Sequence, residues 1–257
     1  MNRYVALGSS MAAGPGIRPG VAAAPRAARR STRNYPHLVA NALNFELVDV
    51  TFSGATTAHL LTERQHGATP QIEALDGSET LVTITIGGND VGYVPLLMAA
   101  TLPRVTRLLP TIGALLDRDK RQQALDEVQG ALRAVGTAVR QRAPRARVIF
   151  VDYLTLLPPA GIRAGGLPEH VVELARHVAD ELERHTATAA AATGAEIVRA
   201  GQASREHHPW SAQPWTVGAG LPLPWRPWPF HPNAAGMAAV ADMVTARLAG
   251  PGIPPAD

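Results

Sequence analysis

Three short segments of glycine and small polar residues each follow a β-rich run of this 257-residue chain. They are Gly8-Ser9-Ser10, Ser53-Gly54 and Gly87-Gly88-Asn89-Asp90, after the runs 4–7, 46–52 and 81–86. A serine at a strand-to-helix turn presents its hydroxyl beside backbone N–H groups, and converging donors can stabilise a tetrahedral oxyanion. The Ser10 N–H, the Gly54 N–H and the Asn89 side-chain amide would supply three such donors.

Each of these residues also has an ordinary structural interpretation. Ser10 can cap a helix, Gly54 can end a strand, and Asn89 can fill a turn after two glycines. Their joint occurrence after three successive strands favours a chemical site over three unrelated structural roles.

A candidate general base lies in the segment Trp-Pro-Phe-His-Pro-Asn at 228–233. His231 directly precedes a predicted final helix that starts at the same sheet edge, and an imidazole suits proton transfer near neutral pH. Taken singly, any one of the nine histidines is more often a surface or core group. The adjacent His207 and His208 have no third ligand at a metal-like spacing and no HExxH motif occurs, so we expect no metal site.

The elements that must position these residues alternate along the chain. Strands are expected at 4–7, 46–52, 81–86, 147–153 and 196–199, and helices at 35–43, 121–142, 168–193 and from a cap at Asn233 to about Gly250. The apolar runs 81–86 and 148–151 are typical of strands buried on both faces, which favours a parallel sheet with helices on each side. The sequence therefore predicts one α/β domain over 1–257, with site-lining loops at about 91–117 and 203–232.

The composition excludes several other chemistries. With no cysteine, there can be no disulfide, zinc thiolate site, iron–sulfur cluster or thiol nucleophile, so a side-chain nucleophile is most simply a hydroxyl. The formal net charge is only +3. The one dense basic cluster lacks interleaved aromatic residues, so we interpret it as a solvated loop rather than a contact with nucleic acid or an anionic surface. Its members are Arg26, Arg29, Arg30 and Arg33.

No apolar run reaches the length of a membrane-spanning helix, and the first residues lack the pattern of a signal peptide. We therefore expect no integral membrane segment and a cytoplasmic location, or secretion if a leader has been removed.

In their order and loop context, the four motifs resemble those of the SGNH hydrolases, also called the GDSL lipase/esterase superfamily. The resemblance extends from residue 4 to about 249. It implies a flavodoxin-like three-layer α/β/α sandwich with a five-stranded parallel sheet, and hydrolysis of carboxylic esters by an acyl-enzyme intermediate without a cofactor. By position, Ser10 matches the nucleophile and His231 the base. Gly54 and Asn89 match oxyanion donors that act with the Ser10 N–H.

The chain departs from the family pattern before the serine. Ser9 stands where the family usually has aspartate, which makes Ser9 a rival nucleophile, although the spacing after Gly8 favours Ser10.

A second departure concerns the acid. Trp228 stands where the family places a carboxylate, three residues before the histidine. A base histidine needs its other ring nitrogen held, so we expect the Trp228 backbone carbonyl to accept the Nδ1–H. The alternative is a carboxylate from elsewhere, namely that of Asp90, Asp152 or Glu206.

The substrate is less defined than the reaction. The segment 91–98, with 115–116, could wall an acyl pocket or simply pack a helix against the sheet. The tryptophans of the last loop could line the site or pack the loop, and they are Trp210, Trp215, Trp225 and Trp228. The expected partner is a small-molecule or lipid ester. Two alternatives stay open: a carbohydrate deacetylase or acyltransferase using the same serine, and a non-catalytic binding protein of the same fold.

Overall fold

A five-stranded sheet lies at the centre of the computed structural model, which describes residues 2–223 and 225–250. Its strands are β1 (Arg3–Gly8), β2 (Glu46–Asp49), β3 (Glu79–Thr85), β4 (Arg147–Val151) and β5 (Glu196–Val198). The strand order is β2-β1-β3-β4-β5 and every neighbouring pair is parallel. The predicted parallel α/β sheet is confirmed. Both β2 and β4 end earlier than expected, because residues 50–52 and 152–153 already belong to the loops that follow.

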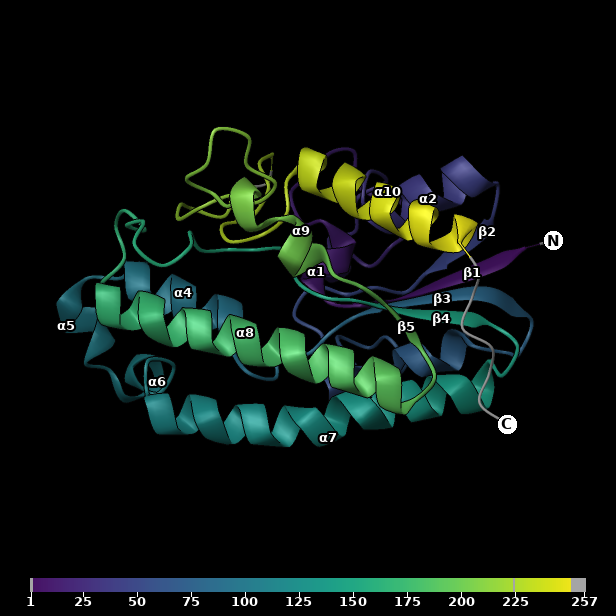
Figure 1. The fold of residues 1–257 in the computed structure, drawn as a ribbon, viewed down its shortest axis with the longest axis horizontal. Coiled ribbons are helices and arrows are strands. Elements are labelled where there is room, and N and C mark those ends of the chain that lie inside the picture. The colour runs from purple at the N-terminus through teal and green to yellow at the C-terminus, as the bar shows by residue number, and fades with distance from the viewer. Residues whose placement is uncertain (1, 224, 251–257) are drawn as a thin grey trace.

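Alternate side chains of β1 enter two different hydrophobic cores. Val5 and Leu7 pack into the core with α7 (Arg118–Arg142) and α8 (Glu169–Ala192). Tyr4 and Ala6 pack into the core with α2 (Tyr35–Leu43) and α10 (Ala234–Ala249). Figure 1 shows the resulting three layers, with α2 and α10 over one face of the sheet and α7 and α8 over the other.

Side-chain caps set where the long helices begin. The Asp117 side chain accepts a hydrogen bond from the Lys120 N–H at the start of α7, and Asn233 accepts one from the Gly236 N–H, at 2.9 Å, at the start of α10. Such caps satisfy backbone donors that have no partner within the helix. Because Asn233 fixes the first turn of α10, it also fixes the end of the loop that carries His231.

Short helices occupy the remaining connections. They are α1 (Ser10–Ala13), α3 (Thr57–Leu61), α4 (Tyr93–Thr101), α5 (Arg104–Arg107), α6 (Pro110–Gly113) and α9 (Ala200–Ala203), with 3₁₀ turns at Arg26–Ala28, Gln71–Ala74 and Arg205–His207. The segment 91–117 therefore consists largely of α4 to α6. Treatment of 1–257 as one domain stays a prediction, and Met1, Pro224 and 251–257 lie outside the described residues.

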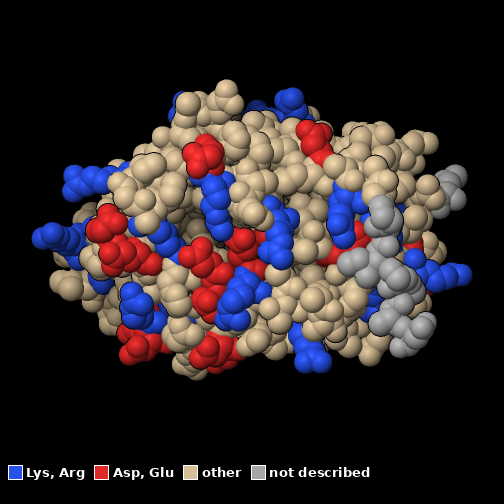
Figure 2. Space-filling view, viewed as in Figure 1, with Lys and Arg blue, Asp and Glu red and all other residues tan. Residues whose placement is uncertain are grey.

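The exposed side of α7 and α8 carries intermixed basic and acidic side chains, as Figure 2 shows. Arg184 pairs with Glu181 and Arg205 pairs with Glu183 on this face. Exposed pairs of this kind contribute little to stability, so the helices are held mainly by their apolar sides. Among the described residues, no helix has the length and apolar character needed to cross a membrane.

Candidate active site

Ser10 and His231 meet at the carboxyl end of β1. The Ser10 Oγ lies 2.8 Å from the His231 Nε2, although the two residues are 221 positions apart. Ser10 is the first residue of α1 and is separated from the end of β1 by Ser9 alone, and His231 lies three residues before α10. Both are nearly buried, with exposed fractions of 6% and 5%. The α/β scaffold thus brings the expected nucleophile and base into direct contact.

The other ring nitrogen of His231 is held by a backbone carbonyl, but the residue differs from the one expected. The Nδ1 atom lies 2.8 Å from the carbonyl oxygen of Pro229. The Trp228 carbonyl instead accepts the backbone N–H of His231, at 3.1 Å. The expectation that Trp228 would orient the ring is therefore wrong, while a main-chain oxygen does stand at this position.

The local backbone explains the difference. The bond from the His231 N–H to the Trp228 carbonyl closes a four-residue turn with Pro229 and Phe230 at its centre. Phe230 has a φ of 56°, which is unusual for a residue with a Cβ, and its side chain is fully buried. This turn uses the Trp228 carbonyl within the backbone and leaves that of Pro229 facing the imidazole.

Because a carbonyl only accepts hydrogen bonds, it fixes the tautomer of a neutral His231. Nδ1 carries the proton, and Nε2 is left to accept the proton of the Ser10 hydroxyl. Burial lowers the pKa of His231 to about 4, against a smaller opposing effect of the Pro229 carbonyl. At neutral pH the imidazole is therefore uncharged and in the form that a general base requires.

The three carboxylates considered as alternatives have other positions. Asp90 accepts hydrogen bonds from the Thr57 N–H and hydroxyl at the start of α3. Asp152 accepts one from the Gly201 N–H at 2.7 Å, and burial raises the pKa of its carboxyl to about 7. Glu206 lies in the exposed turn after α9. Within residues 2–223 and 225–250, no carboxylate lies within ion-pair distance of His231.

Ser9, the rival nucleophile, has a different environment. Its side chain is fully buried, and its hydroxyl lies 2.9 Å from the Tyr153 Oη. The Tyr153 Oη also accepts the Gly88 N–H at 3.0 Å. Ser9 therefore links the loop after β1 to the loop after β3 through one tyrosine, and its hydroxyl has no base beside it. The geometry favours Ser10.

Gly54 lies in a tight turn after β2. The Ala55 N–H bonds the Phe52 carbonyl at 3.0 Å, and Gly54 has a φ of 81°. This positive φ at the third position of the turn suits glycine. In the described part of the chain, the N–H groups of Gly54 and Ser10 have no hydrogen-bond acceptor, so both can bind a substrate oxygen.

The loop after β3 is tied to the Gly54 turn. One N–H of the Asn89 amide bonds the Ala55 carbonyl at 2.9 Å, next to Gly54 in the chain. An amide nitrogen has two N–H donors, so the second remains for a ligand. Asp90 fixes the same two loops together through Thr57. The three expected donors thus come from loops that are bonded to one another.

Sequence reasoning missed two positioning residues. The Gln71 side chain is buried, accepts the Gly8 N–H at 2.7 Å and donates to the Gly8 carbonyl at 3.0 Å. Tyr153 joins Ser9 to Gly88. Tyr153 is the last residue of the predicted strand 147–153, which is a usable signal, whereas nothing in the sequence marks Gln71.

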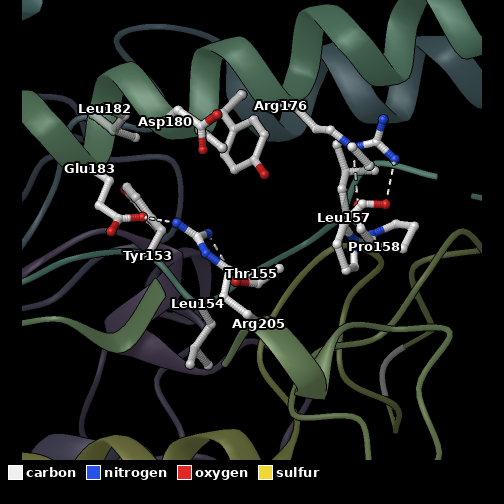
Figure 3. Close-up of a pocket in the computed structure, with 14 residues that line it drawn as sticks. Tyr153, Leu154, Thr155, Leu157, Pro158, Arg176, Asp180, Leu182, Glu183 and Arg205 are labelled. Atoms are coloured by element: carbon white, nitrogen blue, oxygen red, sulfur yellow. Dashed lines mark hydrogen bonds and ion pairs between the residues drawn. The ribbon is translucent and has the colours of Figure 1, made fainter. Parts of the chain in front are cut away.

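A cavity of about 260 Å³ lies beside this site, under α8 and the loop after β4 (Figure 3). Tyr153 forms part of its wall, together with Leu157 and the Arg205–Glu183 ion pair. Ser10 and His231 do not line it. From the segment 91–117 only Tyr93 reaches this cavity, while Leu96 and Leu97 are fully buried in the core. Packing therefore accounts for those two leucines of α4.

The tryptophans of the last loop differ in their surroundings, since one stacks on another loop residue and one lies against His231. Trp215 stacks on His207, with ring centroids 4.0 Å apart. Trp228 is half-buried and lies edge-on to His231, at 6.0 Å between centroids. Trp225 is 60% exposed. Trp228 is thus the tryptophan whose ring lies against His231.

A parallel α/β sheet with a buried serine–histidine pair after its strands is the arrangement of an SGNH-type hydrolase. The sequence profile of the GDSL-like lipase/acylhydrolase family matches residues 6–239, and the chain belongs to this family. The family and its lipase relatives indicate an ester-hydrolysing enzyme, which disfavours the non-catalytic alternative.

The similarity to individual relatives covers most of the chain. Lipase 2 of Streptomyces coelicolor is 32% identical, covering 93% of this chain and 83% of the relative. The crystal structure of an extracellular lipase from Streptomyces rimosus is 26% identical, with a TM-score of 0.80 over 97% of this chain and 100% of that one. Phospholipase A1 from Streptomyces albidoflavus is 25% identical, with a TM-score of 0.78 and coverage of 97% and 99%. These structures confirm the predicted fold.

Proposed function

We propose that the enzyme hydrolyses carboxylic esters of lipids with Ser10 as nucleophile and His231 as base. The observation that carries the proposal is a pair of hydrogen bonds. One joins Ser10 Oγ to His231 Nε2, and the other joins His231 Nδ1 to the Pro229 carbonyl oxygen. This pair permits one neutral tautomer, and that tautomer can remove the serine proton. The names of the lipase relatives support a lipid ester as the substrate class.

The reaction proceeds in two halves. As Ser10 Oγ bonds the acyl carbon, His231 Nε2 takes the hydroxyl proton, and the substrate carbonyl oxygen becomes an oxyanion. The alcohol oxygen then leaves with the proton from Nε2, and the acyl group remains on Ser10. Water attacks this acyl-enzyme in the same manner, and the acid departs.

The oxyanion binds the N–H groups of Ser10 and Gly54 and the free N–H of the Asn89 amide. Their availability in the described residues supports this assignment. The Pro229 carbonyl accepts the Nδ1–H throughout, so its dipole stabilises the transient imidazolium in place of a carboxylate. Because this carbonyl has no full charge, we expect a lower rate of proton transfer by His231 than for a histidine paired with aspartate.

Variants at the two serines test the proposal. Release of p-nitrophenol from short- and long-chain p-nitrophenyl esters is measured for the wild type, Ser10→Ala and Ser9→Ala. Ser10→Ala should lower kcat by roughly 10⁴-fold or more. Ser9→Ala leaves Ser10 and His231 in place and removes only the bond from Ser9 to Tyr153, so it should lower kcat far less than Ser10→Ala does. An organophosphate should label Ser10, as located by mass spectrometry, and equal rates for wild type and Ser10→Ala would refute the assignment.

Two further points belong to the same proposal. Deacetylation of carbohydrate esters and acyl transfer would use the same serine, so acetylated xylan and an acceptor alcohol are included among the substrates tested.

A related lipase is described as extracellular, so we propose secretion of this enzyme as well, to be tested by assaying culture medium and cell extract separately.

A further inference from the structure

The guanidinium of Arg29 lies over the ring of Trp228, with Cζ 4.5 Å from the ring centroid. This distance is within the range of a cation–π contact. The same Trp228 ring lies edge-on to His231, 6.0 Å away between centroids. A fixed positive charge therefore stands one aromatic ring away from the candidate base.

The residues on both sides of Arg29 are hydrogen-bonded to the loop after β2, Ala28 through its backbone and Arg30 through its side chain. The carbonyl of Ala28 accepts hydrogen bonds from the Ser53 N–H at 3.2 Å and from the Ser53 hydroxyl at 2.9 Å. On the other side, the Arg30 Nε donates to the Thr51 carbonyl at 2.6 Å. Ser53 directly precedes Gly54, so Arg29 is anchored beside the proposed oxyanion loop as well as beside Trp228.

The two neighbouring arginines differ in what their charges contact. Arg30 is half-buried and lies 3.9 Å from the Asp49 carboxylate. Arg29 is exposed, and in the part of the chain that the structure describes no Asp or Glu carboxylate is within ion-pair distance of it. The contact with the ring face uses none of the five N–H donors of the Arg29 guanidinium. These donors lie in one plane, in a geometry that can bind two oxygens of a phosphate.

The position of His231 indicates which part of an ester would meet Arg29. His231 Nε2 gives its proton to the leaving alcohol oxygen, so the alcohol portion lies on the His231 side of Ser10. Trp228 borders that side, and Arg29 lies on Trp228. An anionic group carried by the alcohol would reach the guanidinium, whereas the acyl chain extends away from the leaving oxygen.

We propose that Arg29, held by Trp228, binds a phosphate or phosphodiester on the alcohol portion of the ester, and that it makes the enzyme prefer phosphate-bearing lipid esters to neutral ones. This inference rests on the proposed Ser10–His231 function, since it assumes that His231 faces the leaving alcohol. It also gives a function to one member of the basic cluster, while Arg30 has a structural function in the loop after β2.

The test compares two esters that differ in the phosphate. Fatty acid release from dihexanoyl phosphatidylglycerol and from dihexanoylglycerol is measured below their aggregation concentrations, so that surface binding does not contribute. The variants are Arg29→Gln and, as a control, Arg26→Gln, which removes the same charge from an exposed member of the cluster. The ratio of kcat/KM for the phosphate ester to that for the neutral ester is the quantity compared.

We expect Arg29→Gln to lower this ratio about tenfold or more, mainly by raising KM for the phosphate ester, since a charge-assisted hydrogen bond is lost. Arg26→Gln should leave the ratio within about twofold of the wild type, because Arg29 and not Arg26 lies over Trp228 and solvent screens an exposed charge. Arg29→Lys should restore part of the ratio, since it keeps the charge but not the planar fork.

A binding measurement separates this inference from the proposed function. Ser10→Ala and Ser10→Ala/Arg29→Gln are titrated with the dihexyl ether analogue of phosphatidylglycerol, which has no ester to cleave, and Kd is obtained by calorimetry. A higher Kd in the double variant supports the inference even if hydrolysis by the wild type is not observed, in which case the proposed function alone fails. An unchanged Kd, an unchanged ratio, or equal losses on both esters would overturn the function of Arg29.

Discussion

The Nδ1 atom of His231 lies 2.8 Å from the carbonyl oxygen of Pro229, two residues earlier in the chain. A main-chain oxygen thus stands where hydrolases of the triad type have a carboxylate. It orients the ring and sets its tautomer without adding a negative charge. Burial is then the dominant influence on the pKa of His231, and it lowers that pKa to about 4.

The pH dependence of catalysis follows from this environment. Protonated His231 cannot accept the Ser10 proton, so activity is lost as the pH falls through the pKa of the folded enzyme. We expect kcat/KM for a neutral ester to stay high down to about pH 5 and to fall with an apparent pKa near 4. A profile on p-nitrophenyl butyrate, read at a wavelength insensitive to the ionisation of p-nitrophenol, provides the measurement. An acid limb centred on the ordinary value of 6.5 would contradict it.

The same depressed pKa makes the fold sensitive to acid. Between the unfolded value of 6.5 and the folded value of about 4, the unfolded chain binds the proton more tightly than the native one does. His231 therefore contributes stability that is present above pH 6.5 and is lost as the pH falls toward 4. Urea unfolding at several pH values should show a shallower decline in this window for His231→Gln than for the wild type.

Gly54 offers a test of the oxyanion donors. Gly54→Ala places a Cβ on a residue with a φ of 81°, where strain costs about 1 kcal/mol or more, so the turn should shift and carry its N–H away. We expect kcat to fall by roughly tenfold to hundredfold. Gly67→Ala is the matched control, because Gly67 has a φ of 84° and its Cβ would meet nothing within 4 Å. If both variants lose activity equally, the loss reflects strain alone.

Tyr153 is expected to act through position. Tyr153→Phe removes the hydroxyl that joins Ser9 to the Gly88 N–H, which leaves buried polar groups unpaired at a cost of about 1–3 kcal/mol. Both flanking loops carry proposed catalytic groups, so kcat should fall more than KM changes. The control is Tyr93→Phe, at a residue that lines the neighbouring cavity and whose hydroxyl has no hydrogen bond among the described residues. Kinetics and chemical denaturation of both variants separate the two effects.

Gln71 should matter for both stability and rate. Gln71→Leu leaves the N–H and carbonyl of Gly8 without the bonds that now hold the end of β1, so we expect a loss of about 2–4 kcal/mol in the free energy of unfolding. The rate should fall as well, because Gly8 lies two residues before Ser10. Gln123→Leu, at an exposed position of α7, should change stability by no more than about 0.5 kcal/mol. Retention of full stability in Gln71→Leu would show that the two bonds are dispensable.

The sequence predicted much of the scaffold, because hydrophobic periodicity reports local burial. The helices expected at 35–43 and 121–142 match α2 and α7 closely, and each expected strand is found. Strand ends were less accurate, since residues 50–52 are apolar enough to suit a strand yet turn away to form the Gly54 loop. The pairing of Ser10 with His231 could be expected from loop order and from the family resemblance.

The sequence by itself pointed to a hydroxyl nucleophile, favoured a parallel sheet, and showed that no carboxylate stood at position 228. These follow from residue types and local periodicity. Only the tertiary structure decided that Pro229 supplies the orienting carbonyl, that Gln71 and Tyr153 hold the loops, and that Arg29 rests on Trp228. Such features depend on turn geometry and on contacts between residues far apart in the chain, whose directions residue types alone do not specify.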